Sequence, residues 1–293
     1  MEEQRVDSCY LCGCRDFGEV SGTVRDNPKL KILKCGSCNL VFLSSFSHVN
    51  NGFYELSKWH TGLYGEENDI DVDAYIKDRK PDAERYFGSL KELIANKSIL
   101  DFGCGTGEFL IKAKKVAKKA VGLEREEKLK SRFKREKLDV YSDLIDVPGN
   151  FDIITLLHVL EHLPDPVNTL RKLSGKLGDK GQIIVEVPNA NEALIELYQC
   201  ESFSHFTYMS GHLFLFSTST LARIGEKAGL KVNYVKQVQR YPLSNHLYWL
   251  SKGIPGGHEK WAFLDSCELQ SAYEERLASI GCCDTLLASF SID

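Results

Sequence analysis

The sequence predicts an α/β protein, with a largely parallel sheet covered by helices and a small cysteine-rich module in front of it. From Lys97 onward, short apolar segments alternate with helical segments, which is the pattern of parallel strands joined by crossover helices. A glycine-rich loop follows the first of these strands at residues 103–107. Two C-x-x-C pairs precede residue 50, in a part of the chain that is rich in turns.

The predicted elements follow one another in a simple order. Strands are expected at 98–103, 120–124, 138–143, 151–160, 181–189, 231–238 and 285–292. Helices are expected at 82–98, 108–119, 125–137, 166–177 and 217–230, the last of them with cap residues before it. The final strand is expected to pair beside its predecessor as an antiparallel edge. The expected domains are a module at 1–50, a linker and leading helix at 51–96, a sheet domain at 97–238, and an insertion with the final strand at 239–293.

The composition is that of an ordinary globular protein. Of 293 residues, 43% are hydrophobic and 27% are charged, and a net charge of −4 offers no general attraction to polyanions. No apolar run approaches the ~18–20 residues that cross a bilayer, and the acidic N-terminus lacks the apolar core of a secretory signal. We therefore expect no membrane span and a reducing, cytoplasmic location, in which the ten cysteines form no disulfide framework.

The two cysteine pairs have the spacing of a zinc ribbon. Cys9 and Cys12 are separated by 22 residues from Cys35 and Cys38. Each C-x-x-C turn presents two thiolates to one point, and two turns complete a tetrahedron around a structural Zn²⁺. Whether Cys14 joins this site stays open.

The glycine-rich loop differs from a dinucleotide-binding loop in two ways. It has the pattern G-x-G-x-G, one residue tighter than G-x-G-x-x-G, and Asp101 stands at its entrance. A carboxylate ~5 Å from a phosphate costs roughly 1–3 kcal/mol, whereas positive sulfonium and ammonium groups are attracted. The loop therefore favours S-adenosylmethionine over a pyrophosphate.

Two acidic residues at later strand ends support this ligand. Glu124 lies 23 residues after Asp101, where an acid commonly accepts hydrogen bonds from both ribose hydroxyls. Asp143 ends the third expected strand and is placed to reach the adenine amino group.

Three segments of the chain carry a family pattern: LDFGCGTGEF with Glu124, FDIITLLHVLEHLPDP, and GQIIVEVPN. With them, the chain resembles the class I S-adenosylmethionine-dependent methyltransferases over roughly residues 97–238. The branch with an N-terminal zinc-binding module, whose members often act on sugars or other small metabolites, is the most similar. The resemblance implies a seven-stranded Rossmann-like sheet with strand seven antiparallel beside strand six. It also implies that the cofactor is held by Asp101, Gly103, Cys104, Gly105, Thr106, Gly107, Glu124, Asp143, Leu144, Leu157 and His158.

Methylation of oxygen or carbon also requires loss of a proton, for which histidine is the usual general base. Related sugar methyltransferases carry a His-Leu-x-x-Phe-Ser run, which this chain matches at residues 212–217. Carbon-methylating members pair that histidine with a tyrosine three residues earlier, where this chain has Met209; the nearest tyrosine is Tyr208. This departure slightly favours transfer to oxygen, with His212 and Tyr208 as candidate catalytic residues.

The insertion at 239–284 is rich in aromatic residues and is expected to roof the acceptor, with His246 as a third candidate catalytic residue. Packing on the zinc module or on a second subunit is the alternative. Glu161 and His162 lie in a run that recurs in the family whatever the acceptor, so we expect them to pack or cap.

The sequence thus predicts methyl transfer to a small polar acceptor, with a nucleotide-linked sugar or glycan precursor as the first choice. An RNA- or ribosome-directed methyltransferase is one alternative. It is the weaker one, because residues 1–60 carry seven Lys or Arg and seven Asp or Glu, without the basic footprint of phosphate contacts. A cofactor-binding scaffold without catalysis is the other. The oligomeric state is not predicted.

Overall fold

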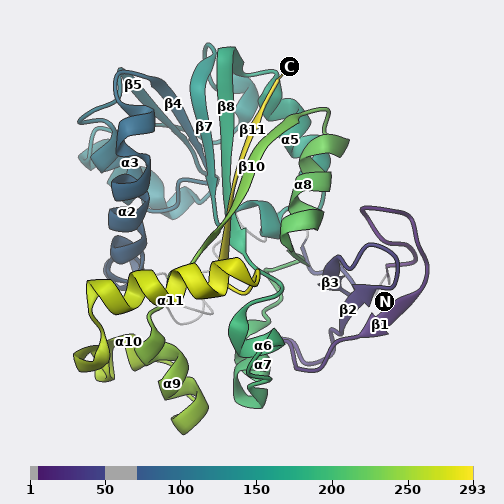
Figure 1. The fold of residues 1–293 in the computed structure, drawn as a ribbon. Helices are drawn as coiled ribbons and strands as arrows, with labels where there is room; N and C mark the ends of the chain where they lie inside the picture. Colours follow the sequence, from purple (N-terminus) through teal and green to yellow (C-terminus); the bar gives the residue numbers. More distant parts are fainter. Residues whose placement is uncertain (1–5, 50–70, 293) are drawn as a thin grey trace.

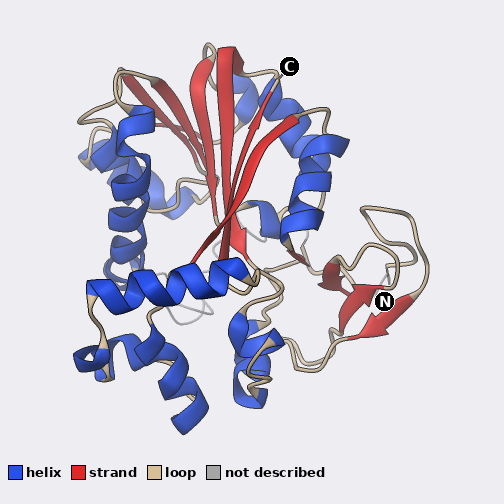
Figure 2. Cartoon of the chain, viewed as in Figure 1, coloured by secondary structure: helices blue, strands red, loops and turns tan. Residues whose placement is uncertain are grey.

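The computed structural model describes residues 6–49 and 71–292, and a seven-stranded sheet forms its centre (Figures 1 and 2). The strand order is β10-β11-β8-β7-β4-β5-β6. The strands are β4 (Ser98–Phe102), β5 (Lys119–Leu123), β6 (Asp139–Tyr141), β7 (Phe151–Leu157), β8 (Leu177–Pro188), β10 (Lys231–Val238) and β11 (Thr285–Ser291).

The final strand is antiparallel and pairs beside its predecessor, as predicted, but it is not an edge strand: β11 lies between β8 and β10, so β10 forms this edge of the sheet. Strands β4 to β8 pair in parallel, and β11 is antiparallel to both of its neighbours, β8 and β10. Because β11 runs the other way, the chain ends near the amino ends of the parallel strands (Figure 1). The segment before β11 consequently lies at their carboxyl ends, where open α/β sheets bind ligands.

Helices cover both faces of the sheet (Figure 1). On one face lie α2 (Val72–Ile94) and α3 (Glu108–Ala113), with α4 (Lys130–Arg135) packed beside α3 through Phe133. On the other lie α5 (Pro166–Ser174) and α8 (Thr218–Lys227). Alternating residues of β8 serve the two layers: Ile183 and Val185 join the larger core with α5 and α8, and Ile184 joins the core under α2.

Most of the predicted elements are shorter in the structure, and the leading helix, expected from residue 82, begins at Val72. Two of the shortened elements are β7 and the helix after the glycine loop. Strand β7 ends at Leu157 because His158 adopts a left-handed backbone (φ 55°), which turns the chain into a 3₁₀ helix at Leu160–His162. The helix after the glycine loop ends at Ala113, and the lysine-rich residues that follow it form turns.

The insertion is helical, which the sequence analysis did not predict. It contains α9 (Leu243–Lys252), α10 (Gly257–Lys260) and α11 (Cys267–Ser279), which gather beyond the carboxyl ends of the parallel strands with α6 (Ala193–Glu196) and α7 (Glu201–Thr207) (Figure 1). Glycines in left-handed conformation bound the short helices, and α11 buries only Leu277. Neither feature gives the long apolar periodicity by which a helix is recognised in a sequence.

The cysteine-rich module forms a second, antiparallel sheet. Its strands β1 (Phe17–Glu19), β2 (Ile32–Cys35) and β3 (Val41–Leu43) pair in order. A fourth strand, β9 (Phe214–Leu215), comes from the segment between α7 and α8 and pairs with β3. The module and the sheet domain are therefore joined by backbone hydrogen bonds.

In the described ranges, no helix combines the length and apolarity that would be needed to span a membrane.

Two glycine-to-alanine substitutions test the helix packing, and they should act in opposite directions. A Cβ at Gly225, on α8, would lie 2.3 Å from the ring of Phe290 on β11, whereas Gly88, on α2, has nothing within 4 Å. Gly225→Ala should lower the free energy of unfolding by about 1–3 kcal/mol through overpacking. Gly88→Ala should raise it by about 0.5–1 kcal/mol because helical glycine carries an entropic cost. Urea unfolding measures both, and equal stability of the two variants would contradict the packing of α8 on β11.

Candidate functional site

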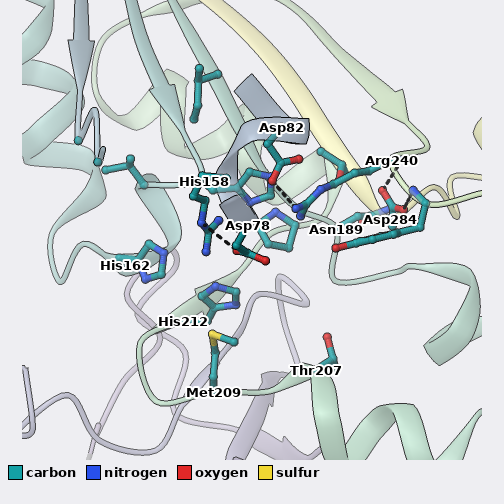
Figure 3. Close-up of a pocket in the computed structure, with 18 of the residues that line it drawn as sticks. Asp78, Asp82, His158, His162, Asn189, Thr207, Met209, His212, Arg240 and Asp284 are labelled. Carbon is teal, nitrogen blue, oxygen red and sulfur yellow. Dashed lines mark hydrogen bonds and ion pairs between the residues drawn. The ribbon is translucent and has the colours of Figure 1, made fainter. Parts of the chain in front are cut away.

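A cavity of about 840 Å³ lies at the carboxyl ends of the parallel strands (Figure 3). One end is formed by the glycine loop and by the ends of β4, β5 and β7. The other is formed by residues 206–209, His212 and residues of the insertion, among them Arg240 and His246. Segments far apart in the sequence thus share one continuous space.

The glycine loop has a backbone that only glycine adopts readily. Gly103, Gly105 and Gly107 all have positive φ, at 75°, 51° and 80°. A Cβ at Gly103 would lie 2.6 Å from Cγ2 of Val159, so this position also lacks room for a side chain.

The N–H groups of this loop are largely used inside the protein. Gly103 and Cys104 both donate to the carbonyl of Leu123, at 2.8 and 3.0 Å, and Gly107 donates to Cys104 at 2.9 Å. Gly105 donates to Oε2 of Glu124 at 2.8 Å. A phosphate-binding loop instead directs several N–H groups at its ligand. The loop therefore lacks the donor set that a pyrophosphate requires.

Asp101 is buried beneath the loop and lines the cavity, with 3% of its surface exposed. Its Oδ1 accepts a hydrogen bond of 2.7 Å from Oγ1 of Thr155 on β7. Burial, together with the nearby charge of Glu124, raises the pKa of Asp101 to about 7. The carboxylate is therefore poised to ionise near neutral pH when a positive group is next to it.

The structure places most of the predicted cofactor residues on this cavity. Those that line it are Asp101, Gly103, Cys104, Gly105, Thr106, Glu124, Leu157 and His158. Gly107 instead caps the start of α3. Asp143 lies with Arg125 at a separate shallow depression, its carboxylate 3.3 Å from the guanidinium, and Leu144 is half-buried against the core.

A buried chain of charges supports the middle of the cavity. The Arg85 guanidinium on α2 donates two hydrogen bonds to Glu186, of 3.0 and 2.5 Å. His158 lies between Glu186 and Glu161, with ring nitrogens 3.2 and 3.3 Å from their carboxylate oxygens. Burial opposes ionisation of all three, but the ion pairs prevail: the pKa of His158 is raised, and those of Glu161 and Glu186 are lowered to about 2.

His212 and Tyr208 lie on the same segment and both line the cavity. Burial and then the neighbouring His162 lower the pKa of His212 to about 3, so its imidazole is neutral. Tyr208 is buried, and burial followed by the charge of Glu192 raises its pKa to about 12, which keeps the phenol protonated.

His246 lines the cavity from α9, but its ring is held by other residues of the insertion. Its Nε2 accepts from the Gln239 amide at 3.4 Å, so Nδ1 carries the proton and donates to the Tyr273 hydroxyl at 2.7 Å. Burial lowers the pKa of His246 to about 4. Both ring nitrogens are thus engaged away from the cavity.

Several site residues were missed by the sequence analysis. Asp82 and Arg85, one turn apart on α2, and Arg240 on the insertion form a buried cluster in which Arg240 pairs with Asp82 (Figure 3). Their burial depends on the contact between α2 and the insertion, which the linear sequence does not indicate. Glu161 and His162, expected to pack or cap, lie beside the cavity: Glu161 is fully buried, and His162 lines the cavity.

The four predicted zinc ligands form one cluster. The Sγ atoms of Cys9, Cys12, Cys35 and Cys38 all lie within 4.8 Å of one another. The Cys9–Cys38 and Cys12–Cys35 pairs are 3.5 Å apart, close to the ~3.8 Å between sulfurs that share a tetrahedral zinc at ~2.3 Å. This donor set is consistent with zinc, and Cys14 is not part of it.

The cysteine module clamps the segment that carries His212. Asp26 accepts from both the N–H and the hydroxyl of Ser210, at 2.8 and 2.7 Å, and His48 donates to the Ser210 carbonyl at 2.7 Å. Leu43 donates to the carbonyl of Leu213 at 3.0 Å, beside the β3–β9 pairing. The position of His212 therefore depends on a folded module.

Removal of single cysteines tests the zinc site. Cys35→Ala should release the metal, with loss of about one zinc per chain in elemental analysis, whereas Cys14→Ala should retain it. The Cys35 variant should still bind S-adenosylhomocysteine, because the glycine loop belongs to the other sheet. Equal zinc content in both variants would contradict the four-cysteine assignment.

Comparisons with known proteins agree with the fold and cavity. A family model described as a methyltransferase domain matches residues 75–235. The ubiquinone biosynthesis O-methyltransferase of Aeromonas salmonicida is 26% identical over 180 residues, which are 54% of this chain and 72% of that protein. The tRNA U34 carboxymethyltransferase of Helicobacter hepaticus is 30% identical over 162 residues, which are 47% of this chain and 49% of that protein.

A solved structure shows the same fold. The S-adenosylmethionine-dependent methyltransferase from Archaeoglobus fulgidus aligns with a TM-score of 0.53 at 21% identity, covering 75% of this chain and 99% of its own. The family match spans more than half of the chain and includes the glycine loop and the strands that border the cavity. The chain therefore belongs to the S-adenosylmethionine-dependent methyltransferases of class I.

Proposed function

We propose that this enzyme transfers a methyl group from S-adenosylmethionine to a hydroxyl oxygen of a small polar acceptor, with a nucleotide-linked sugar as the first choice. The observation that carries the proposal is the continuous cavity, which joins the glycine loop to a polar compartment. Methyl transfer from a sulfonium is an in-line displacement, so the protein mainly has to align donor and acceptor in such a space.

The cofactor occupies the loop end of the cavity in this proposal. Asp101 faces the positive sulfonium and ammonium groups, and the left-handed glycines let the nucleoside approach the backbone closely. Glu124 accepts hydrogen bonds from the ribose hydroxyls. Asp143 lies outside the cavity beside Arg125, which lines both the cavity and the neighbouring depression, and with Leu144 it flanks the adenine where the ligand extends past Arg125. Leu157 and His158 close the site from β7.

The acceptor occupies the other end. Its lining contains positive, negative and amide side chains, which suit the hydroxyls and phosphates of an activated sugar. These residues are Arg25, Asp78, Arg79, Asp82, Asn189 and Arg240. Tyr241 and Trp249 of the insertion add aromatic surface, which packs well on sugar faces. The insertion covers the acceptor.

Transfer to oxygen is supported by relatives that are named O-methyltransferases and by Met209, which stands where carbon-methylating members have a tyrosine. The catalytic candidates that can reach an acceptor directly are His212 and Tyr208. His246 is a third candidate, whose ring nitrogens would first have to leave their partners in the insertion. A neutral His212 accepts a hydrogen bond from the acceptor hydroxyl, and a protonated Tyr208 donates one. A pKa near 3 makes His212 a weak base, so its contribution is chiefly alignment.

An RNA-directed methyltransferase is supported by one observation, the resemblance to the tRNA-modifying protein of Helicobacter hepaticus. Binding of tRNA to the purified protein would have to weaken steeply between low and moderate salt for this alternative to hold. A scaffold without catalysis would bind the cofactor but turn over no acceptor.

The role of Asp101 predicts a pH-dependent affinity for S-adenosylhomocysteine. The carboxylate attracts the ligand's ammonium group and the protonated acid does not, so affinity should rise as pH increases through about 7. Asp101→Asn should weaken binding at high pH roughly 5- to 100-fold, equivalent to about 1–3 kcal/mol. It should also remove the pH dependence that the wild type shows around neutrality. Calorimetric titrations at several pH values measure both, and identical profiles for the two proteins would rule out the assigned role.

The acceptor class is tested by turnover. Purified enzyme with S-adenosylmethionine should convert a nucleotide-linked sugar to a methyl ether and S-adenosylhomocysteine, detected together by mass spectrometry. His212→Ala should lower kcat/KM by roughly 10²-fold or more, as loss of a base or aligning group does, while leaving S-adenosylhomocysteine affinity unchanged. Tyr208→Phe and His246→Gln are compared in the same assay. Turnover of tRNA with no turnover of any sugar nucleotide in the panel would replace this proposal with the RNA alternative.

A further inference from the structure

A second group of potential metal ligands lies beside the acceptor end of the cavity. Glu161, His162 and His212 each offer a donor atom, and these atoms lie within 4.8 Å of one another. Glu161 and His162 come from the 3₁₀ helix after β7, and His212 comes from the segment clamped by the cysteine module. Figure 3 shows the two histidines close together, and their ring centroids are 4.9 Å apart.

The Glu161 carboxylate is buried among imidazole rings. It is fully buried, and within the described residues neither of its oxygens has a hydrogen-bond partner. Its nearest neighbours are imidazoles: His158 at 3.3 Å, without hydrogen-bond alignment, and His162 at 3.9 Å. Both of these contacts are made by Oε1, and the ion pair with His158 offsets part of the cost of burying the charge. Oε2 has no hydrogen-bond partner within the described residues, so this oxygen is available to a metal ion.

The tautomer of His162 favours the same interpretation. Its Nδ1 is 2.7 Å from the carbonyl of Gly211, which can only accept, so Nδ1 carries the proton. In the neutral ring, Nε2 is then the nitrogen that carries a lone pair, and it lies 3.9 Å from Oε1 of Glu161. Metal-binding histidines are commonly oriented in this way, with the second nitrogen donating to a carbonyl.

We propose that Glu161, His162 and His212 bind a divalent first-row metal ion whose remaining coordination positions face the cavity. Two imidazoles and a carboxylate suit Zn²⁺, Mn²⁺, Fe²⁺ or Co²⁺, and three protein ligands leave positions open for a substrate oxygen. His162 and His212 line the cavity, and Glu161 closes the site from behind. This site is distinct from the cluster of four cysteines, whose thiolates fill a tetrahedron.

If the enzyme methylates a hydroxyl, as proposed above, the metal ion also provides a way to activate that hydroxyl. This role of the metal rests on the proposed function, whereas the binding site itself does not. The acceptor hydroxyl binds the ion and loses its proton to water. The oxygen then takes the methyl group from the sulfonium, and S-adenosylhomocysteine leaves with the sulfur electron pair. In this arrangement His212 serves as a ligand, which agrees with its position at the acceptor end.

Cobalt titration of the full-length, zinc-loaded protein tests the site without any acceptor. The wild type should bind one Co²⁺ with the weak visible absorption of nitrogen and oxygen ligands and without the thiolate charge-transfer band of a cysteine site. His212→Ala and Glu161→Gln should each weaken this binding more than about 100-fold, since even outer-shell partners contribute 10- to 100-fold. Besides burial, the positive charges of Arg79 and Arg25 lower the pKa of His162 and His212, and the same charges repel a metal ion. The negative charge of Glu161 opposes this repulsion, so its loss should weaken metal binding.

His205→Gln is the matched control, because His205 is exposed on α7 and contacts Thr23 instead of the cluster. It should bind Co²⁺ as the wild type does. S-Adenosylhomocysteine binding by each variant shows that the fold is intact. Absence of a cobalt signal free of thiolate bands, or equal affinity in all variants, would overturn the site, whatever the outcome of the acceptor assay.

Discussion

The hydrogen bonds inside the glycine loop decide what this protein can bind. Four of the five N–H groups at residues 103–107 are used by Leu123, Cys104 and the Glu124 carboxylate. A loop of this kind has no donor array left for a diphosphate, and the carboxylate of Asp101 lies directly beneath it. The loop instead offers the ligand a backbone surface without side chains, next to the negative charge of Asp101. Such a surface fits a nucleoside that carries a sulfonium. The same strand-loop-helix arrangement that binds phosphates elsewhere is thereby turned to a cationic ligand.

The rest of the site is assembled around this loop from distant parts of the chain. Arg85 on α2 and His158 after β7 meet at Glu186 on β8, and Arg240 on the insertion pairs with Asp82 on α2. The cysteine module adds the clamp on the segment that carries His212. The contacts of Arg85, of Arg240 and of the cysteine module each join segments more than fifty residues apart, and the His158–Glu186 contact joins the ends of two neighbouring strands. The acceptor end of the cavity therefore depends on the complete fold. The cofactor end is built from the glycine loop and from the ends of β4, β5 and β7, which are neighbours in one sheet.

This difference explains how much the sequence predicts. The parallel strands, the antiparallel final strand and the four-cysteine cluster follow from local spacing and periodicity, and the structure agrees with them. The family match supports the cofactor, and most of the residues proposed to bind it line the cavity. The helices of the insertion and the pairing of β9 with β3 did not follow, because short helices and a two-residue strand carry little periodic signal. The surroundings of the buried Glu161 carboxylate could not be predicted for another reason: they come partly from His212, in a segment some fifty residues later.

The central claim is that the loop at residues 103–107 accepts a positively charged nucleoside thioether or sulfonium and excludes diphosphates. Calorimetry of the wild-type protein with S-adenosylhomocysteine and, separately, with NAD tests it most directly. The account predicts saturable binding of one S-adenosylhomocysteine per chain and no heat of binding from NAD under the same conditions. Saturable binding of NAD, without binding of S-adenosylhomocysteine, would contradict it.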